Sequence, residues 1–165
     1  MIRQGNQMGQ MGAWSKTYSI VGGEYYRIDA LCRGSGMSNP RANRYIEVFF
    51  EDDDKKMVID QRTGDYSRPF YPWAEGNKEE WVKFEGTVYA PKNATNATIR
   101  LFLRWEPGAS IEWAQVAFEI VETPKPRKVK LAASNFRPTG GKSAMDNCKM
   151  LVPFIEKAGK QKVDL

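Results

Sequence analysis

The chain has 165 residues, of which 41% are hydrophobic and 12% aromatic, and its formal net charge is +5. This composition suits one packed domain, or one domain and part of a second. No stretch approaches twenty consecutive apolar residues, so the sequence indicates no membrane partner. Histidine is absent, which excludes His-based triads and His-ligated zinc from this chain. The two cysteines, Cys32 and Cys148, have no metal-like spacing, and we expect neither a metal nor a cofactor.

Positive charge is concentrated towards the end of the sequence. Residues 122–165 hold ten Lys/Arg against four Asp/Glu, whereas residues 1–121 hold fifteen against sixteen. A nucleic-acid-binding protein gathers its basic residues on a folded binding face, but here the surplus lies in a linker and on the expected solvent side of a helix. The sequence therefore disfavours nucleic acid as a partner. The first residues lack the apolar stretch of a signal peptide, and the cellular location stays open.

Residues 1–121 have the pattern of an antiparallel β-sandwich or jelly roll. Short apolar-alternating runs are separated by turn residues at fairly even spacing. The seven predicted strands are residues 14–20, 25–32, 44–50, 56–61, 81–90, 98–105 and 111–121. Alternation places Tyr26, Ile28 and Ala30 on the inward face of the second strand. The acidic run 51–54 lacks the ligand spacing of a calcium loop and is interpreted as a solvated hairpin turn.

A long segment without periodicity, residues 62–80, interrupts the strands. Its length points to function, or to a lid over an exposed sheet face. Tyr71 and Trp73 lie in this segment with Arg68 and Asn77 nearby, and exposed aromatic faces with polar neighbours are candidates for stacking on a sugar ring. The alternative is that this pair packs against a neighbouring domain, which the sequence favours. The other large aromatics are expected to belong to the core: Trp81, Trp105 and Trp113.

A Pro-rich linker, residues 122–128, separates the sandwich from a different pattern in residues 129–165. A predicted strand at 129–134 leads through a loop into an amphipathic helix, and a second apolar run begins at 163–165. Strand, helix and strand form the opening of a βαβ unit, which needs a parallel sheet to join. About forty residues cannot build that sheet. We therefore expect residues 129–165 to be the incomplete start of an α/β domain.

Three features of the predicted helix have local interpretations. The run Gly140-Gly-Lys-Ser143 resembles a phosphate-binding loop, but Phe136 stands where that loop needs its first glycine, so Ser143 is interpreted as a helix N-cap. Pro153 either kinks the helix or begins a second helical segment. Cys148 shares the apolar face of the helix and is expected to be buried and inert, as is Cys32.

The run Lys128-Val-Lys-Leu-Ala-Ala-Ser-Asn-Phe-Arg-Pro138, the glycine-bearing loop after it and Asp146-Asn147 together resemble the start of a carbon–nitrogen hydrolase (nitrilase/amidase) domain. The likeness is greatest to members that carry a β-sandwich in front. The resemblance implies an αββα catalytic domain with a Glu-Lys-Cys catalytic set, and usually a homo-oligomer. Val163-Asp164-Leu165 matches the beginning of the strand that ends in the family's Leu-Pro-Glu. None of the catalytic residues is then in this chain, whose first partner is the remainder of that domain.

A second resemblance concerns the sandwich. The run Trp81-Val-Lys-Phe-Glu-Gly-Thr-Val-Tyr-Ala-Pro91, followed by Ala97-Thr-Ile-Arg-Leu101 and by Ile111-Glu-Trp-Ala-Gln-Val116, resembles the last three strands of a galactose-binding-like jelly roll. Such domains occur as carbohydrate-binding modules and usually have eight or more strands, so the resemblance implies that one or two strands are missing before Met1. This likeness implies glycan binding as the alternative function, with Tyr71, Trp73 and Arg68 as contact residues. A purely structural domain that mediates contacts within an oligomer is the third possibility.

Overall fold

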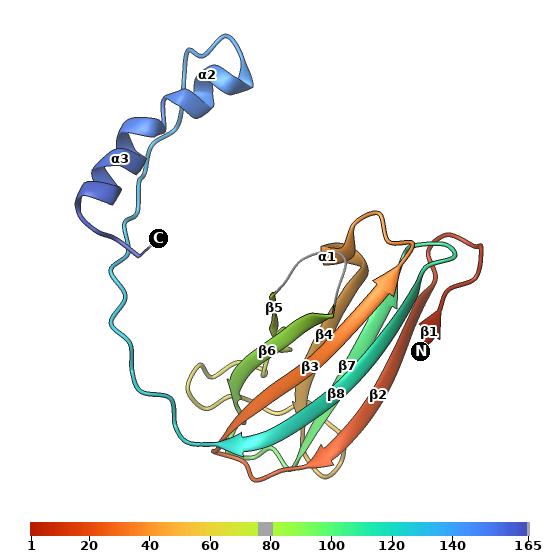
Figure 1. The fold of residues 1–165 in the computed structure, drawn as a ribbon. Helices are drawn as coiled ribbons and strands as arrows, with labels where there is room; N and C mark the ends of the chain where they lie inside the picture. Colours follow the sequence, from red (N-terminus) through yellow and green to blue (C-terminus); the bar gives the residue numbers. More distant parts are fainter. Residues whose placement is uncertain (76–80, 165) are drawn as a thin grey trace. The chain divides into compact units, whose positions relative to one another are not determined.

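A computed structural model describes residues 1–75 and 81–164 of the chain. Asn77 and Leu165, both named above, lie outside the described residues. The chain divides into two units, Met1–Pro124 and Lys125–Leu165 (Figure 1). None of the described helices is long and apolar enough to cross a membrane.

The first unit is a β-sandwich made of two antiparallel sheets, which confirms the predicted fold class for this part of the chain. The five-stranded sheet contains, in spatial order, β1 (Ile2–Arg3), β8 (Ser110–Val121), β3 (Tyr25–Ser35), β6 (Val82–Tyr89) and β5 (Trp73–Glu75). The three-stranded sheet contains β2 (Met11–Ser19), β7 (Asn96–Arg104) and β4 (Arg44–Glu51). A single helical turn, α1 (Pro40–Asn43), precedes β4.

The core lies between the sheets and follows the predicted alternation. Tyr26, Ile28 and Ala30 of β3 are buried, as expected for the inward face of a strand packed on one side. The same holds for alternate residues of β7 and β4, which supply the largest buried side chains of the three-stranded sheet: Ile99, Leu101, Leu103, Ile46, Val48 and Phe50. Cys32 is fully buried, as predicted.

The segment before β5 crosses from one sheet to the other. Phe70 exchanges two backbone hydrogen bonds with Val48 at the edge of β4, at 2.9 and 2.8 Å. Three residues later Trp73 pairs with Glu85 of β6 in the opposite sheet. The Phe70 ring packs where Gly86 has no side chain, since a Cβ there would lie 2.6 Å from Phe70 Cζ. The long segment therefore covers one side of the sandwich, and Gly86 makes room for it.

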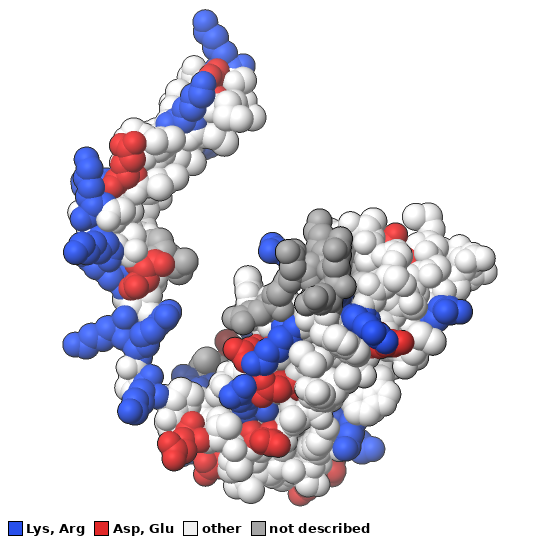
Figure 2. Space-filling view, in the orientation of Figure 1, with Lys and Arg blue, Asp and Glu red and all other residues white. Residues whose placement is uncertain are grey.

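The outer face of the five-stranded sheet carries intermixed acidic and basic side chains (Figure 2). Arg27 pairs with Asp29 at 2.6 Å, and Arg33 pairs with Glu112 at 2.7 Å. Lys83 pairs with Glu85 on the neighbouring strand β6. Because these pairs are exposed to solvent, which screens their charges, each is expected to contribute little to stability. Where the structure describes it, this face therefore carries charges of both signs.

Several sequence predictions for the first unit are wrong. Residues 56–61 form no hairpin strand: only single bridges join Glu51 to Met57 and Ile59 to Tyr66. The chain instead turns back on itself, because Asp60 N–H donates to Asp65 O at 2.9 Å and the Asp60 carbonyl accepts from Gly64 at 2.8 Å. The short strands β1 and β5 were not predicted.

Two of the three tryptophans expected in the core are exposed. Trp105 has a φ of 63° just after β7, and the Arg104 guanidinium lies 3.8 Å from its ring centroid. The Arg33 guanidinium carbon lies 4.9 Å from the Trp81 ring centroid. Only Trp113 packs against the core, with its ring centroid 5.4 Å from that of Phe84.

The second unit contains two helices, α2 (Ala144–Lys149) and α3 (Val152–Lys160). Ser143 Oγ accepts from the Asp146 N–H at 3.1 Å, which confirms the predicted N-cap. Pro153 lies in the first turn of α3, where a missing N–H is tolerated, so the second of the two predictions for this residue is confirmed. No strand forms over residues 129–134, contrary to the sequence prediction.

Cys148 is exposed, so the prediction that it faces a core is wrong. The physical reason applies to the whole unit: no residue between 125 and 164 is buried. The apolar periodicity of the helix is present, but within this unit there is no sheet for it to pack against.

Candidate functional site

A groove lies beside α1 and β5, and we call it the aromatic groove. Its volume is about 310 Å³. The residues that line it come from the α1–β4 connection, the segment around β5, and β6: Pro40, Arg41, Arg44, Tyr45, Tyr71, Pro72, Trp73, Ala74 and Phe84. Two of the three predicted sugar-contact residues, Tyr71 and Trp73, therefore lie together in one groove.

Contacts with β7 and β4 hold the tyrosine side chains of this groove in place. The Tyr45 ring stacks on Phe102 of β7, with centroids 4.4 Å apart and an interplanar angle of 10°. Tyr71 lies next to Tyr45, with centroids 6.0 Å apart, and its hydroxyl donates to Glu47 Oε1 at 3.3 Å. Burial and the neighbouring Glu47 carboxylate raise the pKa of the Tyr71 hydroxyl, so it stays protonated and keeps this hydrogen bond at neutral pH.

Trp73 presents the largest open aromatic surface. It is 75% exposed, and Tyr71 is 56% exposed, although both belong to a segment that is tied to two strands. An exposed indole on a fixed backbone loses little freedom when a flat ligand stacks on it. The pair therefore provides a platform for a ring with an apolar face.

Arginine supplies the charge of the groove. Arg41 and Arg44 line it, and no Asp or Glu is among its described lining residues. Behind them, the Arg104 guanidinium lies 4.3 Å from the Tyr45 ring centroid, and its Nε donates to the carbonyl of Ala42 at 2.9 Å. This bond fixes α1, which carries Arg41, to the end of β7.

Arg44 also lies beside the buried thiol of Cys32. Burial raises the pKa of Cys32 to about 11, although the Arg44 charge acts in the opposite direction. The thiol is therefore neutral at pH 7 and does not balance the positive charge of Arg44.

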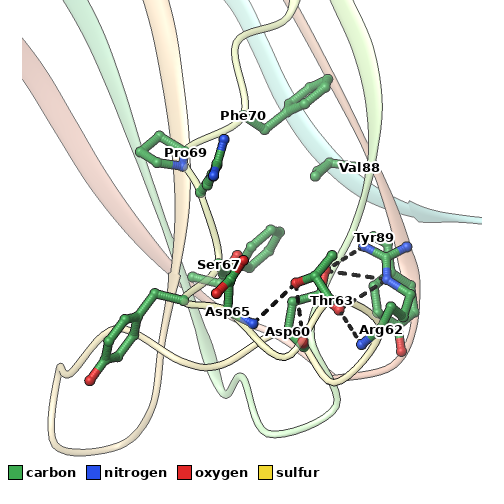
Figure 3. Close-up of a pocket in the computed structure, with 12 residues that line it drawn as sticks. Asp60, Arg62, Thr63, Asp65, Ser67, Pro69, Phe70, Val88 and Tyr89 are labelled. Atoms are coloured by element: carbon green, nitrogen blue, oxygen red, sulfur yellow. Dashed lines mark hydrogen bonds and ion pairs between the residues drawn. The ribbon is translucent and has the colours of Figure 1, made fainter.

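A second hollow of about 390 Å³, the Asp60 pocket, is shown in Figure 3. Its apolar lining comes from Phe50, Phe70 and Val88, and its polar lining from residues 60–68. Asp60 and Arg62 form a fork, with Arg62 Nη2 donating to Asp60 Oδ2 at 2.7 Å and Nε to Oδ1 at 3.0 Å. The same guanidinium lies 3.9 Å from the Tyr89 ring centroid. Asp60 and Arg62 therefore satisfy each other's charge, while Asp65 and Arg68 also line the pocket.

Arg68, the third predicted contact residue, lines the Asp60 pocket and is not among the lining residues of the aromatic groove. Arg41, Arg44 and Tyr45 complete the groove and were not predicted as contact residues. Their signal was an Arg pair followed by an aromatic residue at a loop-to-strand boundary. Among the residues that the structure describes, no group of three or more His, Cys, Asp or Glu side chains is placed to hold a metal ion.

Comparison with known proteins adds evidence on the fold. No protein-family model and no curated protein matches the chain. A similar solved structure is the crystal structure of the enzymatically active domain of tailspike protein 4 from bacteriophage CBA120. The two are 15% identical with a TM-score of 0.50, and the match covers 67% of this chain but only 14% of the tailspike chain. At this identity the likeness concerns the fold alone.

Proposed function

We propose that this chain is the N-terminal part of a carbon–nitrogen hydrolase that acts on a nitrile or amide C–N bond, with the β-sandwich as an accessory domain. The observation that carries the proposal is that the second unit buries none of its residues. Its apolar side chains are exposed along both the segment before the helices and the helices themselves: Val129, Leu131, Phe136, Met145, Val152, Phe154 and Ile155. Such surfaces mark a contact with further protein.

The path of the second unit supports a β-α unit. The Phe136 and Phe154 rings pack with centroids 4.7 Å apart, so α3 lies against the segment that precedes it. After α3 the chain returns to the start of that segment, where the Asp164 N–H donates to the Lys130 carbonyl at 2.9 Å. The Lys130 N–H donates in turn to Asp164 Oδ2 at 2.7 Å. A strand that begins here would lie beside residues 129–134, as the first crossover of a parallel sheet requires.

The chemistry follows from the resemblance to the family. A cysteine thiolate attacks the nitrile or amide carbon, a glutamate acts as the base, and a lysine stabilises the developing negative charge. These three residues belong to the part of the domain after Leu165. Cys148 is not assigned as the nucleophile, because it lies on the exposed helix α2 and the family's nucleophile belongs to a later element.

The proposal is tested on the protein encoded by the whole reading frame. The resemblance expects a Leu-Pro-Glu motif soon after Leu165, and ammonia release from a panel of simple amides and nitriles. Replacing that glutamate by glutamine should abolish release while the thermal unfolding transition is retained. A folded protein that carries the motif but releases no ammonia from any member of the panel would contradict the proposal, as would absence of the motif.

Carbohydrate binding by the sandwich is the second candidate function, and the aromatic groove favours it. The exposed face of Trp73 has the form needed to stack on a sugar ring. Glycan-array binding should be lost in Trp73→Ala and retained in Trp14→Ala, which removes a partly exposed tryptophan of β2 that lines neither hollow. Equal binding by both variants would place the glycan elsewhere.

A further inference from the structure

We propose that the aromatic groove recognises a carboxylate-bearing sugar, such as a uronate residue within an acidic polysaccharide. The inference rests on the second candidate function, carbohydrate binding, and adds to it the chemical class of the ligand. It assigns a role to Arg41 and Arg44, which the sequence analysis did not use.

The groove combines aromatic side chains with arginine side chains. Trp73 and Tyr71 provide exposed aromatic faces, and Arg41 and Arg44 line the same space without an Asp or Glu among the described lining residues. Neither arginine forms an ion pair with any carboxylate that the structure describes. Guanidinium groups bind carboxylates through two parallel hydrogen bonds, a geometry that a neutral sugar hydroxyl cannot match.

Arg41 and Arg44 differ from three other arginines of the sandwich, which form ion pairs. Arg27, Arg33 and Arg62 each pair with a carboxylate at 3 Å or less. Glu47 follows Arg44 by three residues, but it accepts from Tyr71, its carboxylate lies 3.7 Å from Arg100, and it does not line the groove. Glu85, which follows Phe84, pairs with Lys83 and Arg27. Among the residues that the structure describes, no carboxylate offsets the positive charge of Arg41 and Arg44, in contrast to the charges of Arg27, Arg33 and Arg62.

The local charge and the volume of the groove limit the kind of anion that fits. Residues 1–121 hold fifteen Lys/Arg and sixteen Asp/Glu, so the sandwich has no general attraction for a polyanion. The positive charge is local, and it lies beside flat aromatic surface. The volume of about 310 Å³ is near the lower limit of ligand sites, roughly 300–1,000 Å³. This combination fits a carboxylate carried on a sugar ring at one position of a chain.

The experiment is affinity electrophoresis and calorimetry with the full chain. The probe is polygalacturonate, and its matched control is highly methyl-esterified pectin, in which the same sugar carries a neutral ester. Galactan serves as a neutral glycan, and dextran sulfate serves as a polymer with a different anion. Thermal melts of each variant check that the fold is retained.

The decisive variants are Arg41→Gln and Arg68→Gln. Both remove one positive charge from an exposed arginine, but Arg68 lines the Asp60 pocket. We expect polygalacturonate to bind the unmodified chain, with affinity lowered about tenfold to a hundredfold in Arg41→Gln, as befits loss of a charged hydrogen-bonding pair. Arg68→Gln should bind as the unmodified chain does, and Trp73→Ala should lose binding.

Each other outcome has a distinct meaning. Equal binding of esterified and unesterified polymer, unchanged in Arg41→Gln but lost in Trp73→Ala, would overturn the carboxylate assignment and leave carbohydrate binding intact. Absence of binding to every glycan would overturn both carbohydrate binding by the sandwich and the carboxylate assignment. Equal binding of dextran sulfate, or equal weakening by Arg41→Gln and Arg68→Gln, would show a general response to anions and would also overturn the assignment.

Discussion

Replacing Asp60 by asparagine tests what holds the segment that leads to Phe70 and Tyr71. The Asp60 carboxylate accepts from the Arg62 backbone N–H at 2.9 Å and from its guanidinium at 2.7 and 3.0 Å. The Asp60 side chain is only 12% exposed, whereas that of Arg62 is 53% exposed. Asparagine keeps one acceptor for the backbone N–H but loses the charge and one half of the fork.

The magnitude follows from this geometry. Hydrogen bonds to charged groups contribute roughly 1.5–3 kcal/mol, and screening of the exposed guanidinium lowers that value. We expect Asp60→Asn to lower the free energy of unfolding by about 1–2 kcal/mol. Arg62→Lys keeps the charge but loses both the fork and the planar contact with Tyr89. The double variant should therefore lose less than the sum of the two single losses.

The effect depends on pH in a defined direction. The side-chain hydrogen bond from Arg62 lowers the pKa of Asp60, and burial raises it. The backbone hydrogen bond from Arg62 lowers the pKa further, so the net shift is downward. A carboxylate with a depressed folded-state pKa stabilises the fold fully above its unfolded pKa, about 3.9 for Asp. That stabilisation is lost as the pH falls through the folded pKa. The difference in the free energy of unfolding between the unmodified chain and Asp60→Asn should be constant from pH 7 to about 5 and should shrink below about pH 4.

The assay is urea unfolding monitored by tryptophan fluorescence, at constant ionic strength across the pH range. The slope with urea must stay the same for the comparison of free energies to hold. A loss of less than about 0.5 kcal/mol, the range of an ordinary surface substitution, would refute the reasoning. So would a gap of the same size at pH 3 and pH 6.

Three further predictions concern packing and exposure. Gly86→Ala places a Cβ within 2.6 Å of the Phe70 ring and should lower the free energy of unfolding by about 1–3 kcal/mol, part of which Phe70→Leu should restore in urea titrations of the double variant. A thiol reagent at pH 8 should modify Cys148 at once and Cys32 only at the rate of unfolding, because Cys32 is buried and its pKa is raised to about 11. Backbone amides of residues 125–164 should exchange with deuterium far faster than those of the sandwich strands, because no residue there is buried.

Much of the sandwich could be predicted from the sequence because most of its strands are long and turn every second residue towards the core. In β7, Ile99, Leu101 and Leu103 face the core and Arg100 faces solvent, so a shift of one residue would bury charge. The predicted strand at 56–61 failed for a different reason. Its local alternation is outcompeted by the hydrogen bonds that Asp60 makes within its own turn.

The aromatic groove could be predicted only in part. Tyr71 and Trp73 were found because they lie in an aperiodic segment rich in aromatic residues. Arg41 and Tyr45 come from a segment about thirty residues earlier, and the two segments meet only because Phe70 pairs with Val48. β5 has three residues, too few for alternation to show. Contacts that depend on such pairing are set by tertiary structure, not by local pattern.

The two units of the chain use similar apolar patterns with opposite results. In β3 the alternating apolar residues are buried between two sheets, and the pattern is explained by contacts within the unit. In α3 Phe154 and Ile155 remain exposed, although α3 is amphipathic along its length and the helix before it, α2, is capped by Ser143. Capping and periodicity fix the helix locally but do not provide a surface that covers it. The exposed apolar side of the second unit is the surface that the proposed parallel sheet, beginning at the Lys130–Asp164 contact, would cover.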